Sequence, residues 1–215
     1  MVDLRMLAEL KVTASYFKYP QSFKALKSVL PYLFQDLRFV EQPLVLKNII
    51  SHIARCVKLG EENFSKAFGG WRPASDEFGI NPLRPNQVAY TTAGTNEWIW
   101  TSGPAASLLG VFENWIGPFN LPIDRLILVI GYFNLEAIPN TMQIQGFLGD
   151  KTLPVQDVQT LQMKQDPYCI QPDFWIILPR SGMRVAVSAR LLNTTERQGL
   201  LGYCFGDDAE IIATV

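Results

Sequence analysis

The hydrophobic period of this chain changes once, near residues 69–73, and that change limits the folds the chain can adopt. Before it, apolar residues recur every three or four positions, which is the spacing of one helix face. After it, they alternate or form short runs rich in β-branched and aromatic residues, as in strands. Charge changes at the same place, from ten basic and six acidic residues to nine and fourteen. The sequence therefore predicts a helical N-terminal segment (1–70), a proline-rich connector (71–87) and a β-sandwich domain (88–215).

The strongest helical pattern covers residues 44–59. Pro43 suits its first turn and Gly60 its C-terminal cap. Further helices are expected at 2–17, from a Ser22 cap as far as Pro31, and at 61–68. The apolar stripe of the 44–59 helix consists of Leu46, Ile49, Ile50, Ile53 and Val57. We expect this stripe to contact a neighbouring subunit or an inner membrane, the alternative being packing against the chain's own sheet.

The second part of the chain contains a series of short strand patterns separated by glycine, proline and asparagine turns. They are expected at 88–92, 98–101, 108–115, 125–135, 142–148, 153–163, 174–178, 183–192, 200–205 and 211–215. Since no helix-length segment separates the later strands, the pattern favours an antiparallel sandwich or barrel of jelly-roll type over a parallel sheet. Residues 174–178 are apolar on both sides. We therefore expect both faces of this strand to be covered, by the second sheet and the helices or by another subunit.

The residue types that carry most chemistry are scarce. With His52 as the single histidine, a metal site built on two histidines cannot form within the chain. The cysteines, Cys56, Cys169 and Cys204, form no CxxC pair and are expected to be reduced. His52 and Cys56 are four residues apart on one helix, which is typical of a half-exposed helix flank but also of a Cys–His nucleophilic pair. We predict no catalytic residues, no metal and no cofactor.

Large aromatic side chains are the other feature of the β part. Trp98 and Trp100 project from the same face of one predicted strand. Together with Trp115, Phe174 and Trp175, they are predicted to form core or a subunit interface. If they were exposed, the Trp98/Trp100 pair would instead suit a sugar ring. That alternative corresponds to a carbohydrate-binding module or a glycosidase on a β-sandwich.

Residues 174–205 carry a resemblance to a known family. Phe174–Leu178 is a hydrophobic strand, Pro179–Gly182 a Pro-x-x-Gly turn, and 183–191 an alternating strand. A small polar turn and a Leu-x-Gly strand (Leu200–Gly202) follow. This succession resembles the C-terminal strands of viral jelly-roll capsid proteins. It looks most like the small single jelly-roll coat proteins of icosahedral DNA viruses, some of which enclose a lipid membrane.

The resemblance implies a structural subunit of a viral capsid, located in the virion, whose partners are other copies of itself and other virion proteins. A viral spike, fibre or vertex protein is a further alternative. Many RNA-virus coats of this type begin with an Arg-rich arm, whereas residues 1–70 are mildly basic and amphipathic. The formal net charge is −1, so strong nucleic-acid binding is not expected. The N-terminus lacks a basic stretch followed by an apolar region, which favours folding in the host cytoplasm.

Overall fold

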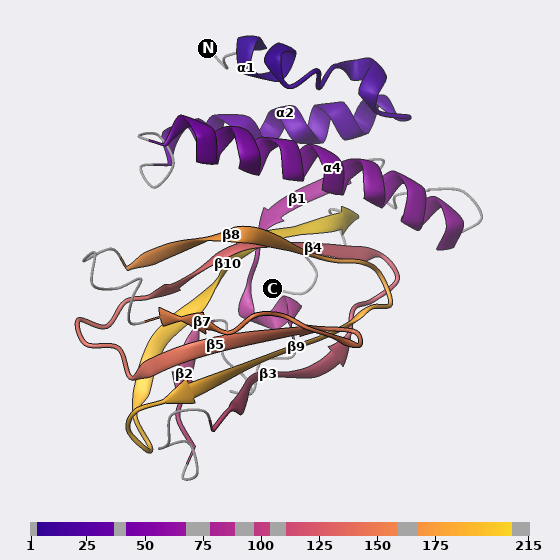
Figure 1. Cartoon of the computed structure of the whole chain (residues 1–215). Helices are drawn as coiled ribbons and strands as arrows, with labels where there is room; N and C mark the ends of the chain where they lie inside the picture. Colours follow the sequence, from indigo (N-terminus) through magenta and orange to yellow (C-terminus); the bar gives the residue numbers. More distant parts are fainter. Residues whose placement is uncertain are drawn as a thin grey trace.

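The computed structural model describes residues 4–36, 42–67, 78–88, 97–103, 111–158 and 167–207, and shows helices stacked on a two-sheet sandwich (Figure 1). The helices are α1 (Leu4–Glu9), α2 (Pro20–Gln35) and α4 (Pro43–Ala67), with 3₁₀ turns at Ala14–Tyr16 and Pro85–Gln87. The strands are β1 (Phe78–Pro82), β2 (Ile99–Thr101), β3 (Glu113–Asn120), β4 (Arg125–Asn134), β5 (Thr141–Leu148), β6 (Lys151–Thr152), β7 (Gln156–Asp157), β8 (Tyr168–Ile177), β9 (Gly182–Ala189) and β10 (Thr195–Asp207).

The strand order is that of a jelly roll. The first sheet has the order β1-β10-β4-β8, with β2 also paired to β10. The second has the order β3-β9-β5-β6, with β7 also paired to β5. Every pairing is antiparallel, and the pairs are nested in the sequence: β1 with β10, β3 with β9, β4 with β8, and β5 with β6 and β7. This is one long hairpin rolled into two sheets, so the predicted mainly β, jelly-roll-like sandwich with N-terminal helices is confirmed.

Two glycines allow neighbouring strands to approach where their register shifts. The β10–β4 register shifts between Leu201 and Gly202, and the β4–β8 register shifts between Val129 and Gly131. A Cβ atom on Gly202 would lie 2.1 Å from the Leu128 carbonyl oxygen, and one on Gly131 would lie 2.1 Å from that of Cys169. Both contacts are shorter than van der Waals distance. These bulges therefore require glycine.

The first sheet is covered on both faces, which explains why the central part of β4 and the end of β8 are continuously apolar. Leu126, Leu128 and Ile130 of β4 pack against the helices in an outer core, while Ile127 and Val129 face the second sheet in an inner core. On β8, Phe174 and Ile176 pack against the outer core, and Trp175 and Ile177 belong to the inner one. The expectation that both faces of 174–178 are covered is thus confirmed, and the helices and second sheet of the same chain provide the cover.

Several predicted helix boundaries are wrong, because tertiary contacts override the local signals. Helix α4 continues through Gly60 to Ala67, so Gly60 is not its cap and the separate helix predicted at 61–68 is the end of α4. The Glu61 carboxylate explains the continuation: it is buried and accepts hydrogen bonds from the backbone N–H groups of Lys18 and Tyr19, both at 3.0 Å. This contact fixes the last turns of α4 against the chain entering α2.

At the other helices, α2 begins at Pro20 with Tyr19 at its N-cap position, so Ser22 is not the cap. Pro31 does not end α2, which continues to Gln35. In the described part of the helix expected at 2–17, only α1 and a 3₁₀ turn are helical.

The predicted connector contains a strand. Residues Phe78–Pro82 form β1, which pairs with Tyr203–Asp207 of β10. This strand was not predicted because Gly79 and Pro82 are residue types that strands usually lack. Strand boundaries also moved. In the described part of 108–115 the strand begins only at Glu113 and continues to Asn120, and only Gln156–Asp157 of the described part of 153–163 is strand. The strand predicted at 211–215 and nearly all of 88–92 lie outside the described residues.

Candidate functional site

The tryptophans predicted to form an interface lie inside the chain. Trp100, Trp115 and Trp175 are all buried in the inner core between the two sheets. Trp98 is half-buried, with its ring 6.3 Å from that of Trp115. Burial of Trp100 also removes the Trp98/Trp100 platform on which the carbohydrate-binding alternative depends. Of the two roles predicted for these residues, core or subunit interface, the structure shows core for Trp100, Trp115 and Trp175. The sequence left both roles open because strand alternation identifies a buried face without identifying what buries it.

Phe174 and the apolar stripe of α4 also pack within the chain. Phe174 is half-buried beneath α4, with its ring 4.8 Å from the His52 ring. The stripe residues Leu46, Ile49, Ile50, Ile53 and Val57 are all buried in the outer core. They are therefore unavailable to a membrane or a neighbour, which corrects the sequence-based assignment. Among the described helices, none combines the length and apolar character needed to cross a membrane.

His52 and Cys56 do not have the geometry of a nucleophilic pair. The Nδ1 atom of His52 lies 2.9 Å from the Asn48 carbonyl oxygen, so Nδ1–H donates to its own helix. Cys56 is fully buried, and this burial raises the pKa of its thiol far above the usual range. Its thiolate population at neutral pH is therefore negligible. Within the described ranges, no group of three or more His, Cys, Asp or Glu residues could hold a metal ion.

The cysteines give a pH-dependent prediction. Burial also raises the pKa of Cys204, to about 12, with Arg125 opposing the rise, whereas Cys169 is half-buried. At pH 7 and at pH 9 alike, Cys56 and Cys204 remain thiols, because both pH values lie below their raised pKa values. In the native protein we expect a thiol reagent such as DTNB to react with Cys169 alone, and Cys169→Ser to abolish labelling. Rapid labelling of Cys56 at pH 7 would contradict the buried geometry and restore the nucleophile hypothesis.

Two turns at one end of the sandwich, the left-hand end in Figure 1, carry four of the exposed large apolar residues. Leu135 and Ile138, in the β4–β5 turn, are 50% and 73% exposed. Leu191 and Leu192, in the β9–β10 turn, are 53% and 40% exposed. We call these four residues the end surface. Grouped apolar residues on turns are characteristic of surfaces that contact another molecule.

The two turns of the end surface are joined by the Asn140 side chain. Its Nδ2 donates to the Leu191 carbonyl oxygen at 2.9 Å, and the Leu191 N–H donates to its Oδ1 at 2.5 Å. Ser102 reinforces the β9–β10 turn, because its hydroxyl donates to the Leu191 carbonyl oxygen at 2.8 Å and accepts from the Thr194 N–H at 2.9 Å. The apolar side chains are thus carried by backbone that is already ordered, which lowers the entropic cost of contact.

A buried carboxylate lies beneath these turns. Glu196, 1% exposed, accepts hydrogen bonds from the backbone N–H groups of Asn140 and Thr141, the latter at 3.0 Å. It also accepts from the Thr141 hydroxyl at 2.8 Å and the Asn134 amide at 3.1 Å. Buried polar groups are stable only when their hydrogen bonds are made, so this cluster fixes a single arrangement of the β4–β5 turn.

Three of the four residues were missed because the predicted strands end too late, by one residue at β4 and by three residues at β9. Leu135 was assigned to the strand at 125–135, and Leu191 and Leu192 to the one at 183–192. Strands β4 and β9 end at Asn134 and Ala189, which leaves these leucines in turns. The sequence did contain a signal for them. Apolar residues stand directly beside turn residues, at positions that are usually polar.

Comparison with known proteins assigns no family to the chain. No protein-family model matches it, and no curated protein shows significant sequence similarity to it. The functional argument therefore depends on the jelly-roll fold and the end surface.

Proposed function

We propose that this protein is a structural subunit of a viral capsid and that copies associate through the end surface. The observation that carries the proposal is the grouping of Leu135, Ile138, Leu191 and Leu192 on two mutually hydrogen-bonded turns. Jelly rolls serve capsids, lectins and cupins alike, so the fold alone does not select a function. The apolar, pre-ordered end surface favours contact between copies of the protein.

The energetics suit a shell built from many copies. A half-exposed leucine or isoleucine contributes about 1 kcal/mol when a neighbour covers it, so one copy of the end surface stabilises a contact only modestly. In a closed symmetric assembly such contacts are repeated in every subunit. Modest contacts then suffice for the whole particle, and shape matters more than reactive groups. This proposal replaces the buried tryptophans with the end surface as the site of association.

The helical layer is not part of the proposed primary contact. Its apolar stripe is occupied by the outer core, so contact with a neighbour or an inner membrane would have to use its exposed residues. Tyr32 of α2 and Leu44 of α4 are the most exposed large apolar residues of the described helices, and Leu44 is 81% exposed. We place them outside the primary contact because they lie on separate helices and are not joined as the two turns are.

The test is assembly of the purified protein, measured by size-exclusion chromatography with light scattering and by negative-stain electron microscopy. We expect wild type to form defined higher assemblies whose population rises with concentration. The double variant Ile138→Asp/Leu191→Asp should remain monomeric at the same concentration, because each assembled contact would bury unpaired charges. Leu44→Asp, an equally polar change at a more exposed site, is the matched control and should assemble normally.

Two outcomes would overturn the proposal. A wild-type protein that stays a monodisperse monomer at high concentration in every salt condition would contradict self-assembly. A double variant that assembles like wild type would remove the end surface as the contact. A closed shell supports a capsid subunit, whereas a discrete trimer or pentamer without a shell would favour a spike or vertex protein.

A further inference from the structure

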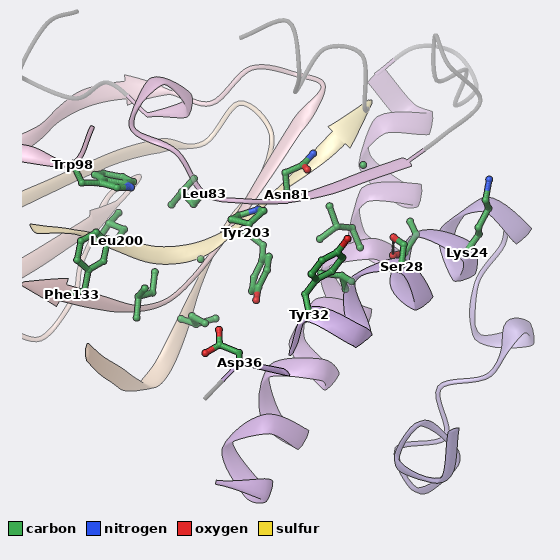
Figure 2. Close-up of a pocket in the computed structure, with 18 of the residues that line it drawn as sticks. Lys24, Ser28, Tyr32, Asp36, Asn81, Leu83, Trp98, Phe133, Leu200 and Tyr203 are labelled. Carbon is green, nitrogen blue, oxygen red and sulfur yellow. Dashed lines mark hydrogen bonds between the residues drawn. The ribbon is translucent and has the colours of Figure 1, made fainter. Parts of the chain in front are cut away.

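Two grooves in the described part of the chain differ in whether their polar side chains are already used. The first, of about 610 Å³, lies between α2 and the first sheet (Figure 2). Lys24, Ser28, Asp36 and Asn81 line it, and each of them interacts with another residue of the chain. The second groove, of about 460 Å³, lies on the second sheet, between β3 and the β5–β9 pair. Its volume is within the range of small-molecule sites in proteins.

Arg184 of β9 is the charged residue of the second groove, and strand alternation directs it outward. Met183 and Val185 on either side belong to the inner core, so the Arg184 side chain projects from the opposite face of β9. On one side it is paired with Phe147 of β5. On the other side the β3–β9 register shifts around Gly117–Pro118, and no β3 residue is paired with Arg184. This bulge leaves space beside the guanidinium group.

Arg184 is held in place without using its hydrogen-bond donors. Its guanidinium carbon lies 3.7 Å from the centre of the Phe147 ring, a distance that requires the flat face of the group to lie on the ring. The N–H groups point along the edge of that plane, so contact with the ring does not consume them. Within the described residues, Arg184 makes neither a hydrogen bond nor an ion pair, although it is half-buried.

Two asparagines and two glycines form the rest of the polar lining. Asn120 at the end of β3 is paired with Gly182 at the start of β9, and a Cβ atom on Gly182 would lie 3.4 Å from the Asn120 Oδ1. The Gly149 N–H donates to the Gly182 carbonyl oxygen at 2.8 Å, which fixes the two glycines side by side. Asn114 and Asn120 are exposed, and neither side chain makes a hydrogen bond within the described residues.

The charge of the groove favours an anion. Among the described residues that line it, Arg184 is the single charged group and no carboxylate is present. Glu113 lies outside the lining and both of its carboxylate oxygens accept from the Gly103 N–H, at 3.0 Å each. Asp150 is exposed and also lies outside the lining. A half-buried cation that lacks a carboxylate partner is a feature of functional sites, because folding alone does not favour it.

We infer that this groove binds an acidic sugar, with the sugar carboxylate on Arg184 and its hydroxyl groups on Asn114 and Asn120. A guanidinium group binds a carboxylate through two parallel N–H···O hydrogen bonds. A side-chain amide both donates and accepts, as a sugar hydroxyl does, so the two asparagines suit hydroxyl groups better than an apolar ligand. A phosphate monoester carries more than one negative charge near neutral pH, which one guanidinium group would neutralise only in part.

The groove is separate from the end surface. Strands β3 and β5 end beside it and β9 begins there, at the right-hand end of the sandwich in Figure 1, whereas the end surface lies on the turns at the other end. Sugar binding therefore does not depend on the proposed assembly. The assembly variant Ile138→Asp/Leu191→Asp should bind the sugar as wild type does, which distinguishes a failure of one proposal from a failure of the other.

The test is saturation-transfer difference NMR, which detects weak ligands on monomers and assemblies alike. We expect methyl β-glucuronide and N-acetylneuraminate to bind to wild type. Methyl β-glucoside, in which a hydroxymethyl group replaces the carboxylate, should bind roughly tenfold more weakly than the glucuronide, the scale of one charge-assisted hydrogen bond.

Three variants locate the site. Arg184→Gln keeps a hydrogen-bonding side chain without the charge, and should lower glucuronide affinity by roughly tenfold and abolish the preference over the glucoside. Arg190→Gln makes the same change at an exposed position outside the groove and should have no effect. Gly182→Leu should weaken both sugars, because its side chain would extend toward Asn120 into the groove.

Four results would overturn the inference. The first is that neither acidic sugar binds to wild type, and the second is that the glucoside binds as tightly as the glucuronide. The third is an affinity unchanged in both Arg184→Gln and Gly182→Leu. The fourth is displacement of the glucuronide by an equal concentration of inorganic phosphate, which would assign the groove to a free oxyanion.

Discussion

Replacing Ile50 with aspartate is expected to detach the helical layer and to leave the chain largely unfolded. Ile50 is fully buried in the outer core that α2 and α4 share with β4 and β10. An aspartate there loses the packing of the isoleucine and buries a carboxylate for which the outer core provides no charge partner. The cost, about 4–5 kcal/mol or more, is comparable to the whole stability of many domains. Urea unfolding followed by circular dichroism measures it.

Leu44→Asp is the matched control for this prediction. Leu44 lies on the same helix but is 81% exposed, so its replacement should change the free energy of unfolding by no more than about 0.5 kcal/mol. If Ile50→Asp unfolded at the wild-type urea concentration, the outer core would not hold the helices. The apolar stripe of α4 would then be free for a neighbour or a membrane, as the sequence suggested.

Replacing Glu196 with alanine is expected to lower the free energy of unfolding by about 3–6 kcal/mol. The carboxylate accepts from the backbone N–H groups of Asn140 and Thr141 and from the Asn134 amide, all in buried surroundings. Removing it leaves the Asn140 and Thr141 N–H groups without an acceptor, at about 1–3 kcal/mol for each unsatisfied group. The Asn134 amide retains the Gln198 Oε1 as an acceptor at 3.4 Å, which keeps the total below the full sum for three donors. Because the same groups order the β4–β5 turn, we expect assembly through the end surface to weaken as well. Thermal unfolding and light scattering measure the two effects.

Two substitutions control for the loss of the carboxylate. Glu136→Ala removes an exposed carboxylate that accepts from the Arg197 N–H at 3.2 Å, and should cost less than about 1 kcal/mol. Glu196→Gln keeps one carbonyl acceptor in place and should have an intermediate effect. A Glu196→Ala variant as stable as Glu136→Ala would show that the buried cluster does not hold the turns.

Several elements were predictable because their periodicity is local. The 44–59 pattern corresponds to the main part of α4, and 125–135 and 142–148 correspond closely to β4 and β5. The errors occur where a contact distant in the sequence overrides the local signal. Glu61 holds α4 beyond Gly60 by binding the chain before α2. Strand β1 forms within a Gly/Pro-rich segment because β10 supplies its hydrogen-bonding partner.

The candidate site was less predictable than the fold. The hydrophobicity of Trp100, Trp115 and Ile50 made them candidates for contact with another subunit. The structure buries each of them within the chain. The residues that remain exposed are ordinary leucines and an isoleucine next to turns. Asn140 and Glu196, whose hydrogen bonds order the two turns, are separated from one another by 56 positions in the sequence. No local pattern connects them, so sequence reasoning could not identify the cluster.

The amino-acid sequence by itself determined the change from helix to strand, the antiparallel sandwich and the need to cover both faces of 174–178, because these follow from side-chain periods of 3.6 and 2. The tertiary structure alone decided the nested strand order, the placement of α2 and α4 over the first sheet, and the identity of the uncovered apolar residues. The physical reason is that the hydrophobicity of a side chain determines only how favourable its burial would be. Whether it is buried depends on which layers of the folded chain reach it.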